Sequence, residues 1–353
     1  MQAALQQLRA RIADAHASST PLRLRGAGTK DFYGEHCEGE LLDLRPYCDV
    51  LDYEPSELVI SARCGTPLST INAQLRQHRQ YLGFEPPAFD GDPTIGGVIA
   101  AGLSGPQRAR VGAARDFVLG AVLLGVDGEL LHFGGKVIKN VAGFDLSRLL
   151  CGSLGILGPI VEVSLKVLPL PQAQHTLCFE MNAGRALQAF NAWRGQPLPI
   201  SACAWMDGCA WVRLSGAESA LRLARERLGG ERVASEAACL WWESIRDQSH
   251  PWFRHATALW RLSLPANAPP VAVDGSPLID WAGALRWYAQ DLPAAHMREL
   301  ARAAGGTALQ WRGGVAGERF HPLSPTVLNL HRALKAQFDP RRIFNRGRLV
   351  AEL

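Results

Sequence analysis

The sequence Gly-Asp-Pro-Thr-Ile-Gly-Gly at positions 91–97 opens the glycine-rich stretch on which the fold depends. It continues as Lys-Asn-Val-Ala-Gly-Phe-Asp-Leu-Ser-Arg-Leu-Leu at 139–150 and Gly-Ser-Leu-Gly-Ile-Leu-Gly-Pro-Ile-Val-Glu-Val at 152–163. Apolar runs typical of strands flank these segments at Phe117–Val126 and Ile160–Leu168. Because glycine has no side chain, its N–H group can approach a phosphate or a ring carbonyl closely. Together the glycines predict a bed for a large flat cofactor, although each one alone is also explained by a turn between strands.

Composition restricts the class of protein. The chain has 353 residues, of which 47% are hydrophobic, enough for one large domain or two. Its net charge is +4, but the arginines are scattered among carboxylates, which argues against a nucleic-acid-binding face. Met1–Ala17 has the spacing of an amphipathic helix rather than a signal peptide, and the longest apolar runs are too short to cross a bilayer. We therefore expect a cytoplasmic protein with no transmembrane segment.

The cysteines and histidines are dispersed. No Cys-x-x-Cys pair occurs among the 8 cysteines, so an iron–sulfur or structural zinc site in this chain is not expected. No His-x-His or His-Glu-x-x-His pattern occurs among the 10 histidines, and the sequence predicts no metal site. Reduced, buried thiols are the expected state of the cysteines.

A shorter glycine loop lies near the N-terminus. The expected strand Leu22–Arg25 runs into Gly-Ala-Gly-Thr at 26–29, whose successive N–H groups could bind an anion, with Arg25 and Lys30 adding positive charge. The spacing does not fit the dinucleotide fingerprint, because Asp31 stands where a glycine is required, and no P-loop motif is present. A pyrophosphate loop and a plain strand-to-helix turn both remain possible here.

Hydrophobic periodicity predicts an α+β chain. Short strands at 41–44, 50–53 and 58–62 precede a helix at 67–77, and Asp127-Gly128 marks a hairpin between apolar runs. The second half holds all 10 tryptophans. Its strand–helix–strand–strand–helix pattern, with strands at 175–181, 200–206 and 209–214 and helices at 185–193 and 219–228, predicts a ferredoxin-like unit.

Several segments in the same order carry a family resemblance. They are Arg25–Thr29, Thr94–Gly97, Lys139–Leu146, Gly152–Gly158 and Phe338–Arg348. With them the chain resembles the FAD-binding superfamily typified by vanillyl-alcohol oxidase, p-cresol methylhydroxylase and the D-2-hydroxyacid dehydrogenases. Within that superfamily it is most similar to the smaller FAD-binding subunit of bacterial glycolate oxidase.

The resemblance implies an FAD-binding domain of the p-cresol methylhydroxylase type at 1–172, with subdomains of about 1–82 and 83–172. A smaller ferredoxin-like cap at 173–335 and a segment at 336–353 that returns to the flavin domain would follow. The FAD is expected to be non-covalent, because no histidine lies in 85–115, where some relatives attach it. The residues that the resemblance implies for the cofactor are Arg25, Gly26, Ala27, Gly28, Thr29, Lys30, Thr94, Ile95, Gly96, Gly97, Gly102, Lys139, Asn140, Gly155, Gly158, Ile160, Asn345 and Arg348.

The implied activity is oxidation of a 2-hydroxy acid, glycolate, to glyoxylate. Catalytic members of the superfamily carry a histidine-rich segment with a Gly-Asp-Gly-Asn core in the cap, which this chain lacks. Arg286, Arg312 and His321 are the best local substitutes for a carboxylate-binding arginine and a base, and each is also explained as a surface charge or a loop histidine. We therefore expect the main substrate site on a larger FAD-binding sister subunit. An iron–sulfur subunit would carry electrons onward, and the complex would be cytoplasmic or peripheral at the inner face of a membrane through its partners.

Three alternatives stay open. The chain could be a self-sufficient FAD-dependent D-2-hydroxyacid dehydrogenase. It could reduce a nucleotide-sugar enolpyruvyl group with NADPH, although its tail motif resembles the hydroxyacid branch. It could also be a non-catalytic assembly subunit with a vestigial flavin site, whose tryptophans form interfaces.

Overall fold

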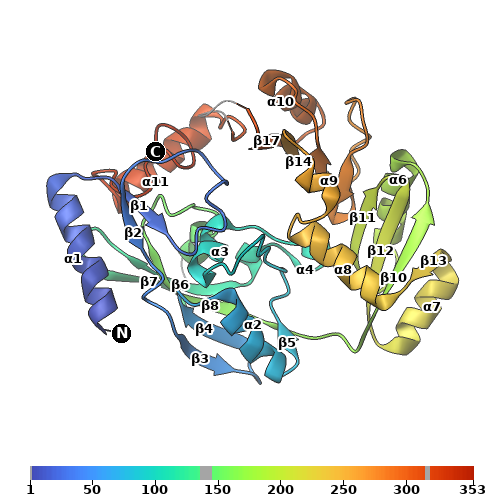
Figure 1. Ribbon diagram of the computed structural model, residues 1–353, viewed down its shortest axis with the longest axis horizontal. Coiled ribbons are helices and arrows are strands. Elements are labelled where there is room, and N and C mark those ends of the chain that lie inside the picture. Colours follow the sequence, from blue (N-terminus) through green and yellow to red (C-terminus); the bar gives the residue numbers. More distant parts are fainter. Residues whose placement is uncertain (1, 136–144, 315–318) are drawn as a thin grey trace. The chain divides into compact units, whose positions relative to one another are not determined.

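The computed structural model describes residues 2–135, 145–314 and 319–353 and forms two compact units (Figure 1). Unit 1 consists of Met1–Leu103, Ala113–Pro169 and Pro322–Leu353. Unit 2 consists of Ser104–Gly112 and Leu170–His321. The chain therefore leaves unit 1 twice, once briefly and once for a long insertion, before its tail returns.

An antiparallel five-stranded sheet in the order β3-β4-β8-β6-β7 forms the centre of unit 1 (Figure 1). The strands are β3 (Val50–Glu54), β4 (Val59–Arg63), β6 (Val118–Leu124), β7 (Leu130–Gly134) and β8 (Ile160–Lys166). In the second half of β8 buried and half-buried residues alternate, as expected for a strand with one face on the core. The hairpin between β6 and β7 turns at Asp127-Gly128, where Gly128 has a φ of 80°, so this predicted turn is confirmed.

The helices of unit 1 include the two that the sequence predicted, at 1–17 and 67–77. They are α1 (Gln2–Ser18), α2 (Leu68–Gln77), α3 (Ile95–Ala101), α5 (Leu146–Leu150) and α11 (Pro325–Phe338), with a short 3-10 turn η1 (Ala114–Asp116). Thr94 caps α3, because its hydroxyl accepts a hydrogen bond from the N–H of Gly97 at 3.3 Å. A small sheet pairs β5 (Gln80–Tyr81) with β9 (Leu168–Pro169).

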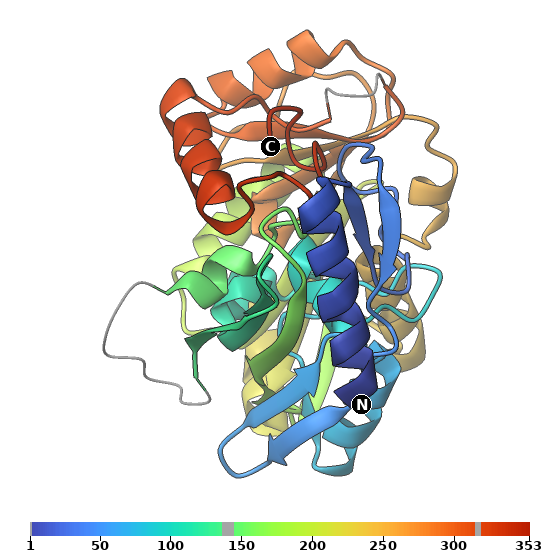
Figure 2. The ribbon, with the colours of Figure 1, turned by 90° about the vertical axis from the view of Figure 1, so that its left-hand side faces the viewer.

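The C-terminal tail joins the N-terminal elements of unit 1. Strand β1 (Leu22–Arg25) pairs in parallel with β2 (Glu40–Asp43), and Phe344 adds a parallel bridge to Leu22. Helix α1 lies beside these strands (Figure 2). Its buried Leu8 and Ile12 pack with Leu22 and with Ile343 and Phe344 of the tail. The first and last segments of the chain therefore share one hydrophobic core.

A buried ion pair fixes the tail. Lys335 is the buried residue of α11, and its ammonium group donates to a carboxylate oxygen of Asp339 at 2.8 Å. It also donates to the carbonyls of Ile156 at 2.6 Å and Phe344 at 2.8 Å. Asp339, which is fully buried, accepts the N–H groups of residues 343 and 344. Burial lowers the pKa of Lys335, and the charge of Asp339 opposes that shift.

An eight-stranded sheet in the order β13-β10-β12-β11-β15-β16-β14-β17 forms the centre of unit 2. Its strands are β10 (Ala173–Glu180), β11 (Ile200–Met206), β12 (Cys209–Gly216), β13 (Glu231–Val233), β14 (Leu259–Ser263), β15 (Leu278–Asp280), β16 (Leu285–Tyr288) and β17 (Thr307–Arg312). The helices are α4 (Arg108–Val111), α6 (Ala183–Arg194), α7 (Glu218–Leu228), α8 (Ser235–Arg246), α9 (Pro251–Arg254) and α10 (Ala294–Ala303), with a 3-10 turn η2 (Trp281–Gly283).

The first four strands of this sheet, with α6 and α7, follow the order β-α-β-β-α-β of a ferredoxin-like unit. Side chains alternate between the two faces, as the strand period requires. Cys203 and Trp205 of β11 belong to the core under α6, whereas Ala202 and Ala204 pack against Trp242 of α8. Figure 1 shows α8 on the side of these strands opposite α6. The other four strands extend the sheet beyond the predicted unit.

The structure differs from the sequence-based expectations in several places. The expected boundary between subdomains at residues 82 and 83 does not divide the strands into two sheets. Strand β4, which precedes this boundary, pairs with β8, which follows it. Helix α11 lies in unit 1 rather than in the segment 173–335, since Lys335 binds the tail, and 104–112 lies in unit 2. The expectation of reduced thiols is wrong for Cys178 and Cys209, which form a disulfide between the adjacent strands β10 and β12 with their Cα atoms 6.2 Å apart.

None of the helices that the structure describes is both long and apolar enough to cross a membrane.

Replacement of Lys335 by methionine should destabilise unit 1 by about 3–5 kcal/mol, because the buried Asp339 carboxylate would lose its counter-charge. Urea denaturation followed by circular dichroism measures the loss. The control is Arg332→Met on the exposed side of α11, which should change stability by less than about 0.5 kcal/mol. Equal stability of the two variants would contradict the role given to this ion pair.

Candidate functional site

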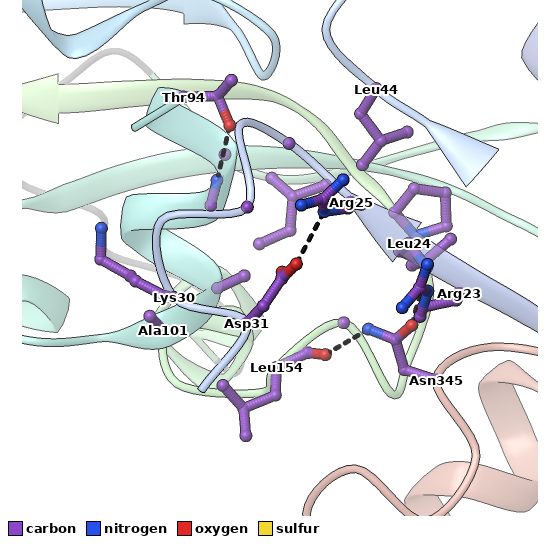
Figure 3. Close-up of a pocket in the computed structure, with 18 of the residues that line it drawn as sticks. Arg23, Leu24, Arg25, Lys30, Asp31, Leu44, Thr94, Ala101, Leu154 and Asn345 are labelled. Carbon is purple, nitrogen blue, oxygen red and sulfur yellow. Dashed lines mark hydrogen bonds and ion pairs between the residues drawn. The ribbon is translucent and has the colours of Figure 1, made fainter. Parts of the chain in front are cut away.

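A pocket of about 350 Å³ lies in unit 1. Most of its lining comes from residues 23–31 within and after β1, residues 93–101 around α3, residues 154–160 at the start of β8, and Asn345 with Arg348 from the tail (Figure 3). His36, Cys37, Leu44 and Cys64 complete the lining. Its volume falls in the range of small-molecule sites. Two of its lining residues, Asn345 and Arg348, belong to the tail, so the tail forms part of the pocket wall.

Strand β1 supplies two of the positive charges. Successive side chains of a strand point to opposite faces, so Arg23 and Arg25 share one side of β1, and both line the pocket. The Nε atom of Arg23 is buried and has no hydrogen-bond partner in the part of the chain that the structure describes. A buried donor without a partner is costly, so this atom points to a ligand that the pocket would hold.

The loop after β1 presents main-chain donors. Within the described residues, the N–H groups of Ala27, Gly28 and Thr29 donate no hydrogen bond to the protein. Gly28 has a φ of 78°, a conformation that favours glycine. A Cβ atom on Gly26 would lie 2.1 Å from the hydroxyl oxygen of Thr94, so the loop approaches α3 as closely as glycine permits. These free donors suit an anionic group such as a phosphate.

The tail closes another wall of the pocket. Asn345, which is buried, accepts a hydrogen bond from the N–H of Leu24 at 2.7 Å and donates to the carbonyl of Leu154 at 2.6 Å (Figure 3). It therefore joins β1 to the loop before β8. A Cβ atom on Gly155 would lie 2.8 Å from the Asn345 amide nitrogen, which requires glycine at that position.

Arg348 holds the outer loop of the pocket. Its guanidinium group donates to the carbonyls of Glu35 at 2.9 Å, Asp31 at 2.8 Å and Tyr33 at 2.5 Å, and to that of Lys30 at 3.3 Å. These bonds fix residues 30–35 against the tail. The geometry gives Arg348 a positioning role for the loop.

An ion pair lies inside the pocket. The Nε atom of Arg25 is 2.8 Å from a carboxylate oxygen of Asp31, and the two side chains are 39% and 51% exposed (Figure 3). Asp31 therefore pairs with Arg25, the arginine that the sequence predicted to bind an anion. An anionic ligand at Arg25 would therefore meet Asp31 as a competitor.

Two thiols also line the pocket. Burial raises the pKa of Cys37, partly opposed by the charge of Arg348, and burial raises the pKa of Cys64 to about 12. Both groups are therefore thiols rather than thiolates near neutral pH, and they are poor nucleophiles.

The pocket brings together every predicted cofactor residue in the described chain except Ile95 and Gly102. Ile95 is buried in the core at the start of α3. Gly102 caps the end of α3 with a φ of 64° and lies against Gly152, so its place is explained by helix termination. Lys139 and Asn140 lie outside the described residues.

Several lining residues were not predicted from the sequence: Arg23, Leu24, Asp31, His36, Cys37, Leu44, Cys64, Pro93, Ala100, Ala101, Leu154 and Pro159. The period-2 pattern of β1 could have identified Arg23 as the neighbour of Arg25 on the same face. For Leu44 and Cys64 the sequence carries no such signal, because their contribution depends on how distant strands pair.

Comparison with known proteins identifies the family. Residues 3–134 match the family described as FAD binding domain. The chain is 44% identical over 352 residues to glycolate oxidase subunit GlcE of Escherichia coli strain K12, covering 100% of this chain and 98% of that protein. The chain belongs to the family of glycolate oxidase subunit GlcE. The predicted resemblance to the smaller FAD-binding subunit of bacterial glycolate oxidase is confirmed.

More distant relatives match less than half of this GlcE family member. Glycolate oxidase subunit GlcD of Bacillus subtilis strain 168 is 32% identical over 161 residues, which cover 44% of this chain and 34% of that protein. Among solved structures, alkyldihydroxyacetonephosphate synthase superposes with a TM-score of 0.66 at 16% identity, covering 96% of this chain and 75% of that one. This likeness supports the α+β fold.

The donor set fits the cofactor of this family. FAD carries a diphosphate, which suits the Arg23 Nε atom and the free N–H groups of residues 27–29. The remaining lining includes Leu24, Leu44 and Leu154, which can contact flat rings. The residues present are therefore compatible with FAD.

The three catalytic candidates lie in unit 2, each bound to the main chain. Arg286 is fully buried and donates to the carbonyls of Gly283, Pro269 and Ala268. Arg312 donates to the carbonyls of Phe253 at 2.7 Å and Ala256 at 3.0 Å. The Nδ1 atom of His321 accepts the N–H of Ala308 at 3.4 Å, and burial lowers the pKa of this histidine. The three side chains therefore bind different main-chain groups and share no hydrogen-bond partner.

Replacement of Asn345 by alanine should cost about 2–4 kcal/mol, because two hydrogen bonds are lost and the groups at Leu24 and Leu154 are left without partners. Chemical denaturation of the full chain measures this cost. Asn329→Ala, on the exposed side of α11, is the matched control and should remain within about 0.5 kcal/mol of the parent protein. If the two variants are equally stable, Asn345 does not hold the pocket wall.

Proposed function

We propose that this chain holds one FAD, without a covalent bond, as the smaller flavin subunit of a multi-subunit glycolate oxidase. In this proposal the larger FAD-binding subunit oxidises glycolate to glyoxylate, and an iron–sulfur subunit accepts the electrons. The family membership supplies the class of complex. The pocket of unit 1, with its unpaired donors, is the observation that carries the proposal for this chain.

Each wall of the pocket has a distinct task in this proposal. The loop 26–30 and Arg23 bind the diphosphate, because they present main-chain N–H groups and a buried guanidinium donor. Gly96 and Gly97 lie along the cofactor, where their lack of side chains leaves room. Asn345 and Arg348 position the surrounding loops through the bonds described above.

Unit 2 supports a division of labour between subunits. Bound FAD would accept a hydride from the carbon that carries the substrate hydroxyl. That reaction also needs an arginine for the substrate carboxylate and a base for the hydroxyl proton. All three guanidinium nitrogens of Arg286 and one of Arg312 donate to main-chain carbonyls, and His321 accepts a main-chain N–H group. This engagement favours a substrate site on the sister subunit.

Non-covalent binding is supported by the state of the pocket thiols. Attachment through Cys37 or Cys64 would need a thiolate, and the raised pKa values of both oppose it. His36 also lines the pocket, outside the segment 85–115.

Acid precipitation of the loaded protein tests whether the FAD is bound without a covalent bond. The flavin should stay in the supernatant, and yellow precipitate would show a covalent bond.

We assign the flavin domain to unit 1 and the cap to unit 2, whose first half has the ferredoxin-like order. The complex is proposed to be cytoplasmic or peripheral at the inner face of the membrane through the partner subunits.

An absorbance spectrum of the purified chain, before and after anaerobic glycolate, tests the proposed function. We expect flavin bands that persist with glycolate. Rapid bleaching would instead make the chain a self-sufficient dehydrogenase. A chain that stays colourless after addition of FAD would be an assembly subunit with a vestigial site.

The variant Gly26→Ala should lose FAD, because its Cβ atom would lie 2.1 Å from the hydroxyl oxygen of Thr94. Gly135→Ala is the matched control, since a Cβ there meets nothing within 4 Å, and it should bind FAD like the parent chain. FAD titration followed by flavin fluorescence compares the two. Equal affinities would place the cofactor elsewhere.

Asp31→Asn should bind FAD about fivefold more tightly, which is ~1 kcal/mol, because the carboxylate that competes at Arg25 is removed. The same fluorescence titration measures the change. Asp14→Asn on the exposed face of α1 makes the same change in net charge away from the pocket and should leave the affinity unaltered. An equal gain in both variants would show a general charge effect instead of competition at Arg25.

A further inference from the structure

A second pocket, of about 310 Å³, lies wholly within unit 2. It is formed by α4, the C-terminal end of α6, β11 and the turn η2. Its volume is at the lower end of the range of small-molecule sites. The proposed FAD pocket belongs to unit 1, so this second pocket is separate from it.

The charged side chains that line the second pocket are all positive. Arg110 of α4 and Arg194 at the end of α6 both line it, and both are exposed to solvent. Among the residues that the structure describes, neither arginine has an ion-pair partner, and no aspartate or glutamate lines the pocket. Because arginine stays charged at physiological pH, the pocket attracts an anion.

The body of the pocket is apolar. The buried Phe190 and Leu198 and the half-buried Trp193 and Ile200 line it, so a ligand with charge alone would leave the exposed parts of Trp193 and Ile200 in contact with water. Phe190 and Trp193 form a ring pair, with centroids 6.0 Å apart. The combination of apolar walls and two guanidinium groups suits a ligand that has an apolar or aromatic body and one anionic end.

One wall is held in a strained conformation. Trp281 and Ala282 have φ values of 51° and 54°, which non-glycine residues rarely adopt, and Ala282 lines the pocket. The N–H of Trp281 donates to Asp280 at 2.7 Å, its indole N–H donates to the carbonyl of Gly105 at 2.9 Å, and the Arg108 guanidinium lies 4.2 Å from its ring. Such outliers persist where surrounding contacts enforce them and often mark ligand sites.

The chemistry of the second pocket favours binding over catalysis. Burial raises the pKa of the Cys203 thiol, so it is not a nucleophile near neutral pH. The Ser201 hydroxyl donates to the carbonyl of Arg213 at 3.1 Å and accepts from the guanidinium of the same residue. Neither group is available to attack a ligand.

We propose that this second pocket binds a small organic carboxylate with an apolar or aromatic body. The two guanidinium groups hold the carboxylate, and the side chains of α6 and β11 cover the body. The site goes beyond the proposed flavin function, because it needs neither FAD nor the pocket of unit 1.

Isothermal titration calorimetry of the full chain with phenylacetate tests the proposal, with the neutral isostere phenylacetamide as the matched ligand. We expect phenylacetate to bind at least tenfold more tightly than phenylacetamide. The double variant R110A/R194A should weaken phenylacetate binding at least tenfold. Arg185→Ala, on an exposed position of α6 outside the pocket, should leave the affinity unchanged.

Tryptophan fluorescence locates the bound ligand. Trp193→Phe should remove most of the phenylacetate-dependent change in fluorescence, because Trp193 lines the pocket. Circular dichroism checks that the double variant is folded. We expect it to fold, because both replaced arginines are exposed. The proposal is overturned if phenylacetate does not bind, if both ligands bind equally, or if the double variant binds as the parent does. Each of these results is independent of whether the chain binds FAD.

Discussion

The ammonium group of Lys335, a residue of α11, lies inside unit 1 at a position where an apolar side chain would be expected. Three oxygen atoms surround it, from Asp339 and from the carbonyls of Ile156 and Phe344. Removal of these charges from water is costly, and only a complete set of partners compensates for it. The segments that supply the two carbonyls, 154–160 and 343–348, also form two walls of the pocket of unit 1. The site therefore depends on an interaction that never touches the proposed ligand.

The pocket illustrates which features a sequence reveals. Glycines at 26, 28, 96, 97 and 155 were visible because their function depends on the absence of a side chain, and that absence can be read directly. Leu44 was not predicted because its place depends on which strand lies beside β1, whereas the alternation within β1 alone could have identified Arg23. The helix α11 also escaped notice, since a lysine in an amphipathic pattern is ordinarily assigned to the solvent face, whereas Lys335 is buried.

The same distinction holds in unit 2. The five elements from β10 to α7 were predicted because each apolar run is bounded by clear turns, such as Asp207-Gly208. The strands β13 to β17 were not predicted, because a short strand shows its pairing partner only after the chain has folded. The candidates Arg286 and Arg312 were chosen for their chemistry, but the structure employs both to hold main-chain carbonyls. Burial of a guanidinium is tolerable when carbonyl oxygens satisfy its donors.

The pairing of Asn345 with Leu24 has a consequence for biosynthesis. The two residues are separated by 321 positions, so a ribosome that adds about 5–20 residues per second needs roughly 15–60 s to make the second after the first. During that interval β1 and the loop before β8 lack the amide that joins them. In a nascent chain the glycine loop is therefore exposed long before the pocket wall at Asn345 can form.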